Sequence, residues 1–295
     1  MLKRRKFRLR LRSGALELGE RTLVMGVLNV TPDSFSDGGK FLDPERAVDH
    51  ALEMEKAGAD LLDIGGESTR PGSTGTPVET ELARVLPVLE GLRGRLKIPI
   101  SIDTRKSQVA EAAISAGAEI INDVSGLGSD RRIAEVAYRR GVALLLMHMR
   151  GDPETMQKKP FARDVMKDVA QGLRKSIAVA RKAGIAKSQI VIDPGIGFGK
   201  SFEQNYELLR KLPELAKLGY PLLVGTSRKG FLGTTLSQDG KAAGTEDRLW
   251  ATAATVTASI LGGAHIVRVH DVAEMAQAVR AADCVLDAGN CRKFR

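Results

Sequence analysis

The chain has 295 residues, of which 43% are hydrophobic, and this length and composition suit one large domain with a substantial core. Its formal net charge is +9, but ten of its 45 basic residues lie in the first twelve and last four positions, so the rest carries 35 basic against 36 acidic side chains. Aromatic residues make up only 4%. Nucleic-acid binding is not expected, because it needs a basic folded face with stacking rings.

Two further features bear on where the protein acts. No apolar run approaches ~20 residues, so we expect no membrane span, and no apolar segment follows the basic N-terminus as it would in a secretory signal. Cys284 and Cys291 lack the spacing of a metal or redox motif. We therefore expect a cytoplasmic protein without a disulfide framework.

The first predicted element is a β-hairpin. Residues 7–18 alternate between apolar and basic or polar side chains around Ser13 and Gly14, as strands on either side of a turn do. We expect the hairpin to plug the N-terminal mouth of the main body that follows it, with its arginines on a solvated face. The division is a single domain over 1–295, with a basic N-terminal hairpin over 1–22, a main body over 23–289 and a tail over 290–295.

From residue 23 onward, short apolar runs alternate with segments of helical spacing. The runs predict buried strands over 23–30, 61–66, 98–103, 119–124, 142–148, 189–193, 221–226 and 265–269. Helices are predicted over 44–57, 106–116, 164–183 and 246–261 among others, each followed by a glycine, a common stop signal. Strands alternating with helices require a parallel sheet. Eight such units predict an α/β fold, a (β/α)8 TIM barrel; the alternative, an open doubly wound sheet, is weakened because no glycine-rich dinucleotide turn follows the first strand.

Each predicted strand ends in a polar residue, or a polar loop follows it. These positions are Asn29, Asp63 with Arg70 on the next loop, Asp103, Asn122 with Asp123, His148, Asp193, Lys229, and Arg268 with His270. One such aspartate alone would be explained as a helix N-cap. Burying the whole set costs several kcal/mol unless partners satisfy it, so a polar ligand is expected. Acceptors beside cations suggest a nitrogen heterocycle joined to phosphate. His148 stays open between a core histidine and a ligand.

Two loops stand out at these strand ends. The segment after Asn29 is rich in Pro, Asp, Ser and Gly and carries Asp33 and Asp37 on a loop where α/β barrels place chemistry. The glycines of Gly195–Gly199 are a weak signal for phosphate binding, and they equally suit a tight turn over a ligand.

Eight segments together resemble the dihydropteroate synthases, which are pterin-binding enzymes of folate biosynthesis. In chain order they are NVTPDSFSDGG from Asn29, DIGGESTRPGS from Asp63, SIDT from Ser101, IND from Ile121, LMHM from Leu146, IDPGIGFGK from Ile192, TSRK from Thr226 and RVHDV from Arg268. The resemblance implies a transferase that condenses 6-hydroxymethyl-7,8-dihydropterin pyrophosphate with p-aminobenzoate. It implies loss of pyrophosphate to a pterin cation, followed by attack of the amine to give 7,8-dihydropteroate.

The resemblance also implies a role for each matched position. The pterin pocket falls on Asp103, Asn122, Val124, Met147, Asp193, Phe198 and Lys229. The pyrophosphate subsite falls on Asn29, Arg268 and His270, with Asn29 as the ligand of a Mg²⁺ cofactor. The p-aminobenzoate subsite, where sulfonamides should compete, falls on Phe35, Thr69, Arg70, Pro71 and Lys229. The implied catalytic residues are Asp37, Arg70, Asp193 and Lys229.

Further implications concern assembly and the alternatives. Family resemblance suggests a homodimer, with the apolar stretch Trp250–Leu261 and the helix that follows it as a candidate face. Gly230 departs from the pattern, since some relatives carry a serine there near the carboxylate of p-aminobenzoate. A pterin-dependent methyltransferase would not need the loops after Asn29 and Asp63 together. A class I aldolase would use Lys229 as a Schiff base, and a catalytically silent homologue would not need the intact polar set.

Overall fold

The computed structural model describes residues 4–31, 43–68, 72–152, 154–158, 162–289 and 291. Within these ranges, eight parallel strands form one sheet in the order β8-β7-β6-β5-β4-β3-β10-β9. They are β3 (Leu23–Asn29), β4 (Leu61–Gly65), β5 (Ile100–Asp103), β6 (Ile120–Asp123), β7 (Ala143–Met147), β8 (Ile190–Asp193), β9 (Leu223–Val224) and β10 (Ile266–Val269). A parallel bridge between Ile192 and Leu222 joins the two edges. The sheet thereby closes into the predicted TIM barrel.

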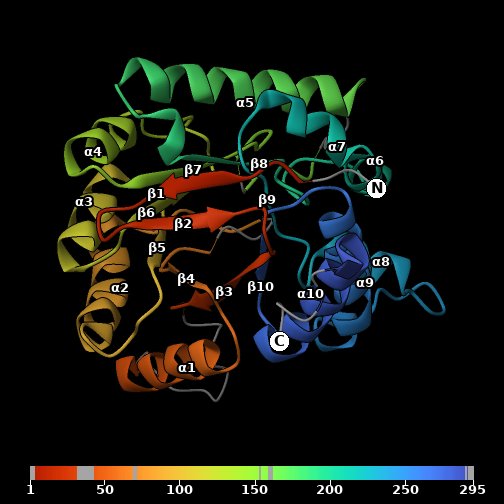
Figure 1. The fold of residues 1–295 in the computed structure, drawn as a ribbon, viewed down its shortest axis with the longest axis horizontal. Coiled ribbons are helices and arrows are strands. Elements are labelled where there is room, and N and C mark those ends of the chain that lie inside the picture. Colours follow the sequence, from red (N-terminus) through yellow and green to blue (C-terminus); the bar gives the residue numbers. More distant parts are fainter. Residues whose placement is uncertain are drawn as a thin grey trace.

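Helices surround these strands, as Figure 1 shows. They are α1 (Pro44–Lys56), α2 (Val78–Leu92), α3 (Ser107–Ala116), α4 (Arg132–Arg140), α5 (Val165–Lys182), α6 (Phe202–Arg210), α7 (Leu212–Leu215), α8 (Gly230–Thr235), α9 (Leu249–Leu261) and α10 (Val272–Leu286). Short 3₁₀ turns are η2 (Lys187–Gln189), η3 (Ala216–Leu218) and η4 (Glu246–Arg248). The helix predicted over 246–261 begins as η4 and continues as α9. In the part of the chain that is described, no helix has the length and hydropathy to cross a membrane.

The inward side chains change character along several of the strands. In β4, Leu61 belongs to an apolar cluster at the N-terminal end, whereas Asp63, two residues on, bonds to polar side chains of β6 and β10. In β10, Ile266 belongs to the same cluster, and Arg268 faces the opposite end. Residues two apart on a strand share a face. The barrel interior is therefore apolar at its N-terminal end and polar at its C-terminal end.

The predicted hairpin is confirmed as β1 (Phe7–Arg10) paired antiparallel with β2 (Ala15–Leu18). It lies across the barrel strands in Figure 1, and its buried residues Leu9, Leu11 and Leu18 join the apolar cluster of the barrel interior. The arginines of its strands and turn are exposed, as predicted. The hairpin closes the N-terminal end because its leucines fill the space between the strands.

A buried ion pair fixes the chain just before this hairpin. The Arg4 guanidinium donates to Asp283 Oδ1 of α10 at 2.6 Å, and the two side chains are 6% and 2% exposed. Asp283 also accepts from the backbone N–H of Thr22 at 2.7 Å. Three segments that are remote in sequence therefore meet at one carboxylate.

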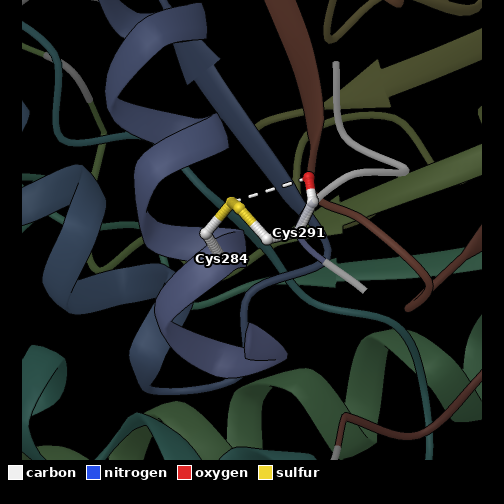
Figure 2. The surroundings of a disulfide bond; sticks show 2 residues. All are labelled: Cys284 and Cys291. Atoms are coloured by element: carbon white, nitrogen blue, oxygen red, sulfur yellow. Dashed lines mark hydrogen bonds between the residues drawn. A yellow bond between two sulfur atoms is a disulfide. The ribbon is translucent and has the colours of Figure 1, made fainter. Parts of the chain in front are cut away.

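The expectation about the cysteines was wrong. Cys284, in the last turns of α10, forms a disulfide with Cys291, and Figure 2 shows the chain returning toward the helix after its end. The Cα atoms lie 4.6 Å apart although seven positions separate the residues. The sequence spacing did not reveal the pair because it depends on how the chain turns after Leu286.

Candidate active site

The polar ends of the strands surround one cavity at the C-terminal mouth of the barrel. Its volume is about 650 Å³. All ten predicted pterin and pyrophosphate residues line it: Asn29, Asp103, Asn122, Val124, Met147, Asp193, Phe198, Lys229, Arg268 and His270. Residues from seven of the strands and the loops after them thus converge on one space, which is where TIM barrels carry their active sites.

Four of the five predicted p-aminobenzoate residues and two of the four predicted catalytic residues lie outside the described residues, and Arg70 belongs to both sets. They are Phe35, Asp37, Thr69, Arg70 and Pro71. The chain on either side of 69–71 is fixed by side chains. Ser73 Oγ donates to the carbonyl oxygen of Ser68 at 2.7 Å, and Glu67 Oε1 accepts from Thr76 N at 2.8 Å. Glu67 and Ser68 line the cavity, so the loop that follows β4 starts from the rim of the cavity.

Arg268 links the acceptors on the floor of the cavity. Its Nε donates to Asp63 Oδ2 at 2.6 Å, and its Nη2 donates to Asp103 Oδ2 at 2.9 Å. Asn122 Nδ2 donates to the same oxygen of Asp63 at 2.9 Å. One buried network therefore joins four strands. It places a cation directly beside the acceptors that the sequence assigns to the pterin.

Burial changes the protonation of Asp103. It raises the pKa of this carboxyl to about 7, with the Arg268 guanidinium opposing the shift and the nearby Asp63 carboxylate adding to it. Asp103 is therefore protonated more readily than an exposed aspartate; when ionised it accepts from a ring N–H, and when protonated it can also donate to a ring nitrogen.

Asp193 is held by the loop that follows it. Its Oδ1 accepts from Gly195 N at 2.6 Å, and burial raises its pKa to about 6, against the effects of this bond and of Lys229. Gly195 has φ +67°, and a Cβ there would lie 2.0 Å from the carbonyl oxygen of His148. Only glycine fits this close approach. The glycine loop therefore packs against the end of β7 and aims Asp193 into the cavity.

An apolar wall stands beside the acceptors. Val124, Met147 and Phe198 pack together with Met156, which the sequence did not predict. The ammonium nitrogen of Lys229 lies 4.0 Å from the centre of the Phe198 ring. Burial lowers the pKa of Lys229 to about 8, and Arg268 lowers it further while Asp193 opposes the shift. The cavity therefore suits a flat ring, because it offers an apolar wall to one face of the ring and a row of polar groups to its edge.

His270 is a neutral hydrogen-bonding group at the rim. Its Nδ1 lies 3.0 Å from Ser227 Oγ, which also accepts from the His270 backbone N–H at 3.2 Å. Burial lowers the pKa of His270 to about 3, and the Arg268 charge acts in the same direction. The imidazole is uncharged at neutral pH, so it would meet an anion as a hydrogen-bond donor.

His148 lies away from the cavity, against α5. Its Nε2 is 3.7 Å from Asp168 Oδ2, and a Cβ on Gly172 would lie 2.3 Å from its Cδ2. Burial lowers the pKa of His148 to about 3. Of the two interpretations that the sequence left open, the structure therefore favours a core histidine.

Sequence reasoning assigned no subsite to two buried residues at the site. Asp63 was counted only among the polar strand residues, although its position two residues after Leu61 puts it on the inward face. Lys200 donates to the carbonyl oxygens of His148 and Gly195, each at 2.8 Å, and burial lowers its pKa to about 7. It ties β7 to the glycine loop, and only its place at the end of the motif IDPGIGFGK signalled it.

The sequence and the structure of this chain are similar to those of known proteins. The family described as pterin binding enzyme matches residues 25–270. A dihydropteroate synthase from Synechocystis sp. is 48% identical over 267 residues, covering 90% of this chain and 91% of that protein. The structure of a Xanthomonas albilineans dihydropteroate synthase with 4-aminobenzoic acid superposes with a TM-score of 0.88 at 43% identity, covering 96% of this chain and 99% of that one. The Yersinia pestis enzyme in a sulfonamide drug complex also gives 0.88, at 41% identity over 95% of this chain and 99% of that one. The family match spans every strand end that lines the cavity.

Proposed function

This chain belongs to the dihydropteroate synthases of the pterin-binding enzyme family, and we propose that its cavity works by loss of pyrophosphate to a pterin cation. The reaction joins 6-hydroxymethyl-7,8-dihydropterin pyrophosphate to p-aminobenzoate. The observation that carries the proposal is the meeting of buried acceptors, an apolar wall and cations in one cavity.

The pterin ring binds edge-on to the acceptors. Asp103 and Asn122 face the N–H donors of the ring, and Asp193 approaches it from β8. The ring lies against Met147 and Phe198, where flat aromatic surface is buried. The cavity discriminates against other ligands because each buried acceptor that a wrong ligand leaves unpaired costs about 1–3 kcal/mol of binding free energy.

The bond that breaks joins the pterin methylene carbon to the pyrophosphate oxygen. Both electrons leave with the oxygen, and the ring stabilises the resulting cation by resonance. The Asp193 carboxylate lowers the energy of that cation, while Arg268 and the His270 imidazole donate to the departing anion. The aromatic amine then attacks the carbon with its lone pair, and its proton passes to the released pyrophosphate or to water. It needs positioning more than activation.

The proposed cofactor is Mg²⁺, with Asn29 as its protein ligand. Asn29 lines the cavity and carries an amide oxygen, and Mg²⁺ is commonly held by few protein oxygens together with water and substrate phosphate. In the described ranges no group of three His, Cys, Asp or Glu could hold a metal by itself. The donor set fits an ion that arrives with the pyrophosphate and neutralises its charge.

The p-aminobenzoate subsite is proposed at the cavity rim. Lys229 supplies a cation there, and Thr69, Arg70 and Pro71 follow the rim residues Glu67 and Ser68. A relative binds 4-aminobenzoic acid and another a sulfonamide drug. Sulfonamides should therefore compete with p-aminobenzoate in this chain also.

Calorimetry with two variants tests the division into subsites. Arg70→Ala should weaken p-aminobenzoate and leave pterin pyrophosphate nearly unaffected. Arg268→Ala should weaken pterin pyrophosphate more than phosphate-free 6-hydroxymethyl-7,8-dihydropterin. Loss of a charge-assisted contact costs ~1.5–3 kcal/mol, which is roughly a tenfold to hundredfold change in dissociation constant. Equal losses for both pterins in Arg268→Ala would place this arginine outside the pyrophosphate subsite.

We also propose a homodimer formed through α9 and α10. Trp250 is 79% exposed, and Leu261 and Val285 add exposed apolar surface on the same two helices. Large exposed aromatic side chains commonly anchor interfaces. Light scattering should give a dimer mass for the wild type and a lower mass for Trp250→Glu. A monomeric wild type would exclude the dimer. The cytoplasmic location stays a prediction of the sequence.

A further inference from the structure

Asp63 lies beneath the cavity, at a position no subsite includes. It is the third residue of β4 and its side chain is fully buried. In the register of the sheet it is opposite Ser101 of β5, which is equally buried. Both point into the barrel, one layer below the residues that face a ligand. Any effect of Asp63 on a bound ligand therefore passes through the side chains that it contacts.

A single oxygen of Asp63 orients both Asn122 and Arg268. Oδ2 accepts from Asn122 Nδ2 at 2.9 Å and from Arg268 Nε at 2.6 Å. A carboxylate only accepts, so the Asn122 amide must turn its NH₂ group toward Asp63 and leave Oδ1 as the acceptor. Arg268 is held by the same atom through Nε, while its Nη2 reaches Asp103.

We propose that Asp63 is a positioning residue that couples the pterin and pyrophosphate subsites. It fixes Asn122 as an acceptor for a ring N–H donor, and it holds the Arg268 guanidinium in the orientation that meets the anion. This inference rests on the proposed function, because it assumes that Asn122 meets the pterin and Arg268 the pyrophosphate.

A double-mutant cycle with the phosphate-free dihydropterin tests the first half. Asp63→Ala should raise its dissociation constant on the order of tenfold to hundredfold in the wild-type background. In an Asn122→Ala background the same change should matter less than about threefold, because the oriented amide is gone. Ser101→Ala is the matched control. It removes a buried hydroxyl that has no partner in the described structure, and it should leave binding unchanged.

The ratio of the dissociation constants of the two pterins tests the second half. Asp63→Ala should reduce the preference for the phosphorylated ligand, and this reduction should vanish in an Arg268→Ala background. Asp63→Asn keeps an oxygen acceptor at the same place and should recover part of both losses. This variant also provides a folded protein if Asp63→Ala does not fold, as judged by circular dichroism.

The outcomes separate two failures. A wild type that does not bind pterin pyrophosphate would overturn the proposed function. A wild type that binds, with additive effects of Asp63→Ala and Asn122→Ala and an equal loss in Ser101→Ala, would show that Asp63 only fills space. Non-additive effects with an inert Ser101→Ala support the positioning role.

Discussion

The two ends of the barrel are built from the same strands but from opposite kinds of side chain. At the N-terminal end, inward residues such as Met25, Leu61 and Ile266 pack against the leucines of the hairpin. At the C-terminal end, inward positions one or two steps further along the strands, such as Asn29 and Arg268, are polar and line a cavity. One or two steps of a period-two pattern thus separate a packed core from a reactive site.

The apolar end of the barrel contributes stability, and the polar end provides the site for chemistry. Burying the apolar end contributes roughly 25 cal/mol per Å² of apolar surface. The polar end keeps carboxyls whose pKa is raised by burial, so keeping them ionised at neutral pH costs folding free energy. Variants at the N-terminal end should therefore change the free energy of unfolding, and variants at the C-terminal end should change binding and rate.

The largest expected effect is on stability, in Asp283→Ala at the N-terminal end. The change leaves the buried Arg4 guanidinium and the Thr22 N–H without their shared acceptor. Breaking a buried pair from one side costs about 3–5 kcal/mol. Urea unfolding should report this loss while kcat and KM at moderate temperature stay unchanged. Glu17→Ala is the control, because the Arg8–Glu17 pair is exposed and is worth about 0–1 kcal/mol. Similar losses in both variants would contradict the argument.

Asp193→Asn should show the reverse pattern at the C-terminal end. Asparagine keeps the size and an acceptor for Gly195 N but removes the charge that we propose stabilises the pterin cation. The expected loss of transition-state stabilisation is roughly 2–4 kcal/mol in kcat/KM. The free energy of unfolding should not fall, because a buried carboxyl has been replaced by a neutral amide. Unchanged kcat/KM would mean that Asp193 serves only to shape the turn after β8.

The pH dependence of stability sharpens the contrast at this residue. The pKa of Asp193 is raised from 3.8 to about 6 in the folded protein, so the native state binds this proton more tightly than the unfolded state. Its contribution is complete below the unfolded pKa and is lost as pH rises through about 6. Relative to Asp193→Asn, the wild type should therefore lose about 1–3 kcal/mol between roughly pH 4 and pH 8.

Catalysis should respond to the same titration with the opposite sign. On the proposed mechanism the carboxylate acts only when it is ionised, so log kcat/KM of the wild type should rise with pH through about 6, the pKa of Asp193 in the ligand-free protein. Asp193→Asn should lack this rise. Stability and rate that increase together over this interval would exclude Asp193 as the group responsible.

The fold could be predicted from the sequence because it depends on local patterns. Parallel strands covered on both faces are continuous apolar runs, and each barrel strand lies within its predicted range. The strand ends were found for the same reason, since a polar residue that closes an apolar run stands out. The predicted cavity residues follow directly from that signal and from the family resemblance.

The remaining features depend on contacts between distant parts of the chain. Asp63 gains its meaning from Asn122 and Arg268, which are 59 and 205 positions away. Lys200 acts on backbone carbonyls, which carry no sequence signal. The pairing of Cys284 with Cys291 depends on a turn after a helix. These contacts become visible only when the strands are assembled in their order.

The smallest predicted effect concerns Gly230, at the start of α8 on the cavity rim. A Cβ at this position would meet no heavy atom within 4 Å, so a larger side chain fits without displacing a neighbour. If the carboxylate of p-aminobenzoate lies nearby, the hydroxyl of Gly230→Ser should donate to it. A gain of about 0.5–1.5 kcal/mol is expected, or roughly a twofold to tenfold lower KM.

Gly230→Ala separates this hydroxyl effect from the loss of backbone freedom. Both variants restrict the unfolded chain equally, so their free energies of unfolding should rise together by up to about 1 kcal/mol. Only the serine variant should bind p-aminobenzoate more tightly, and its KM for pterin pyrophosphate should not change. Equal p-aminobenzoate affinities in the two variants would move this subsite away from the start of α8, and would leave Lys229 to meet the carboxylate without help from the next residue.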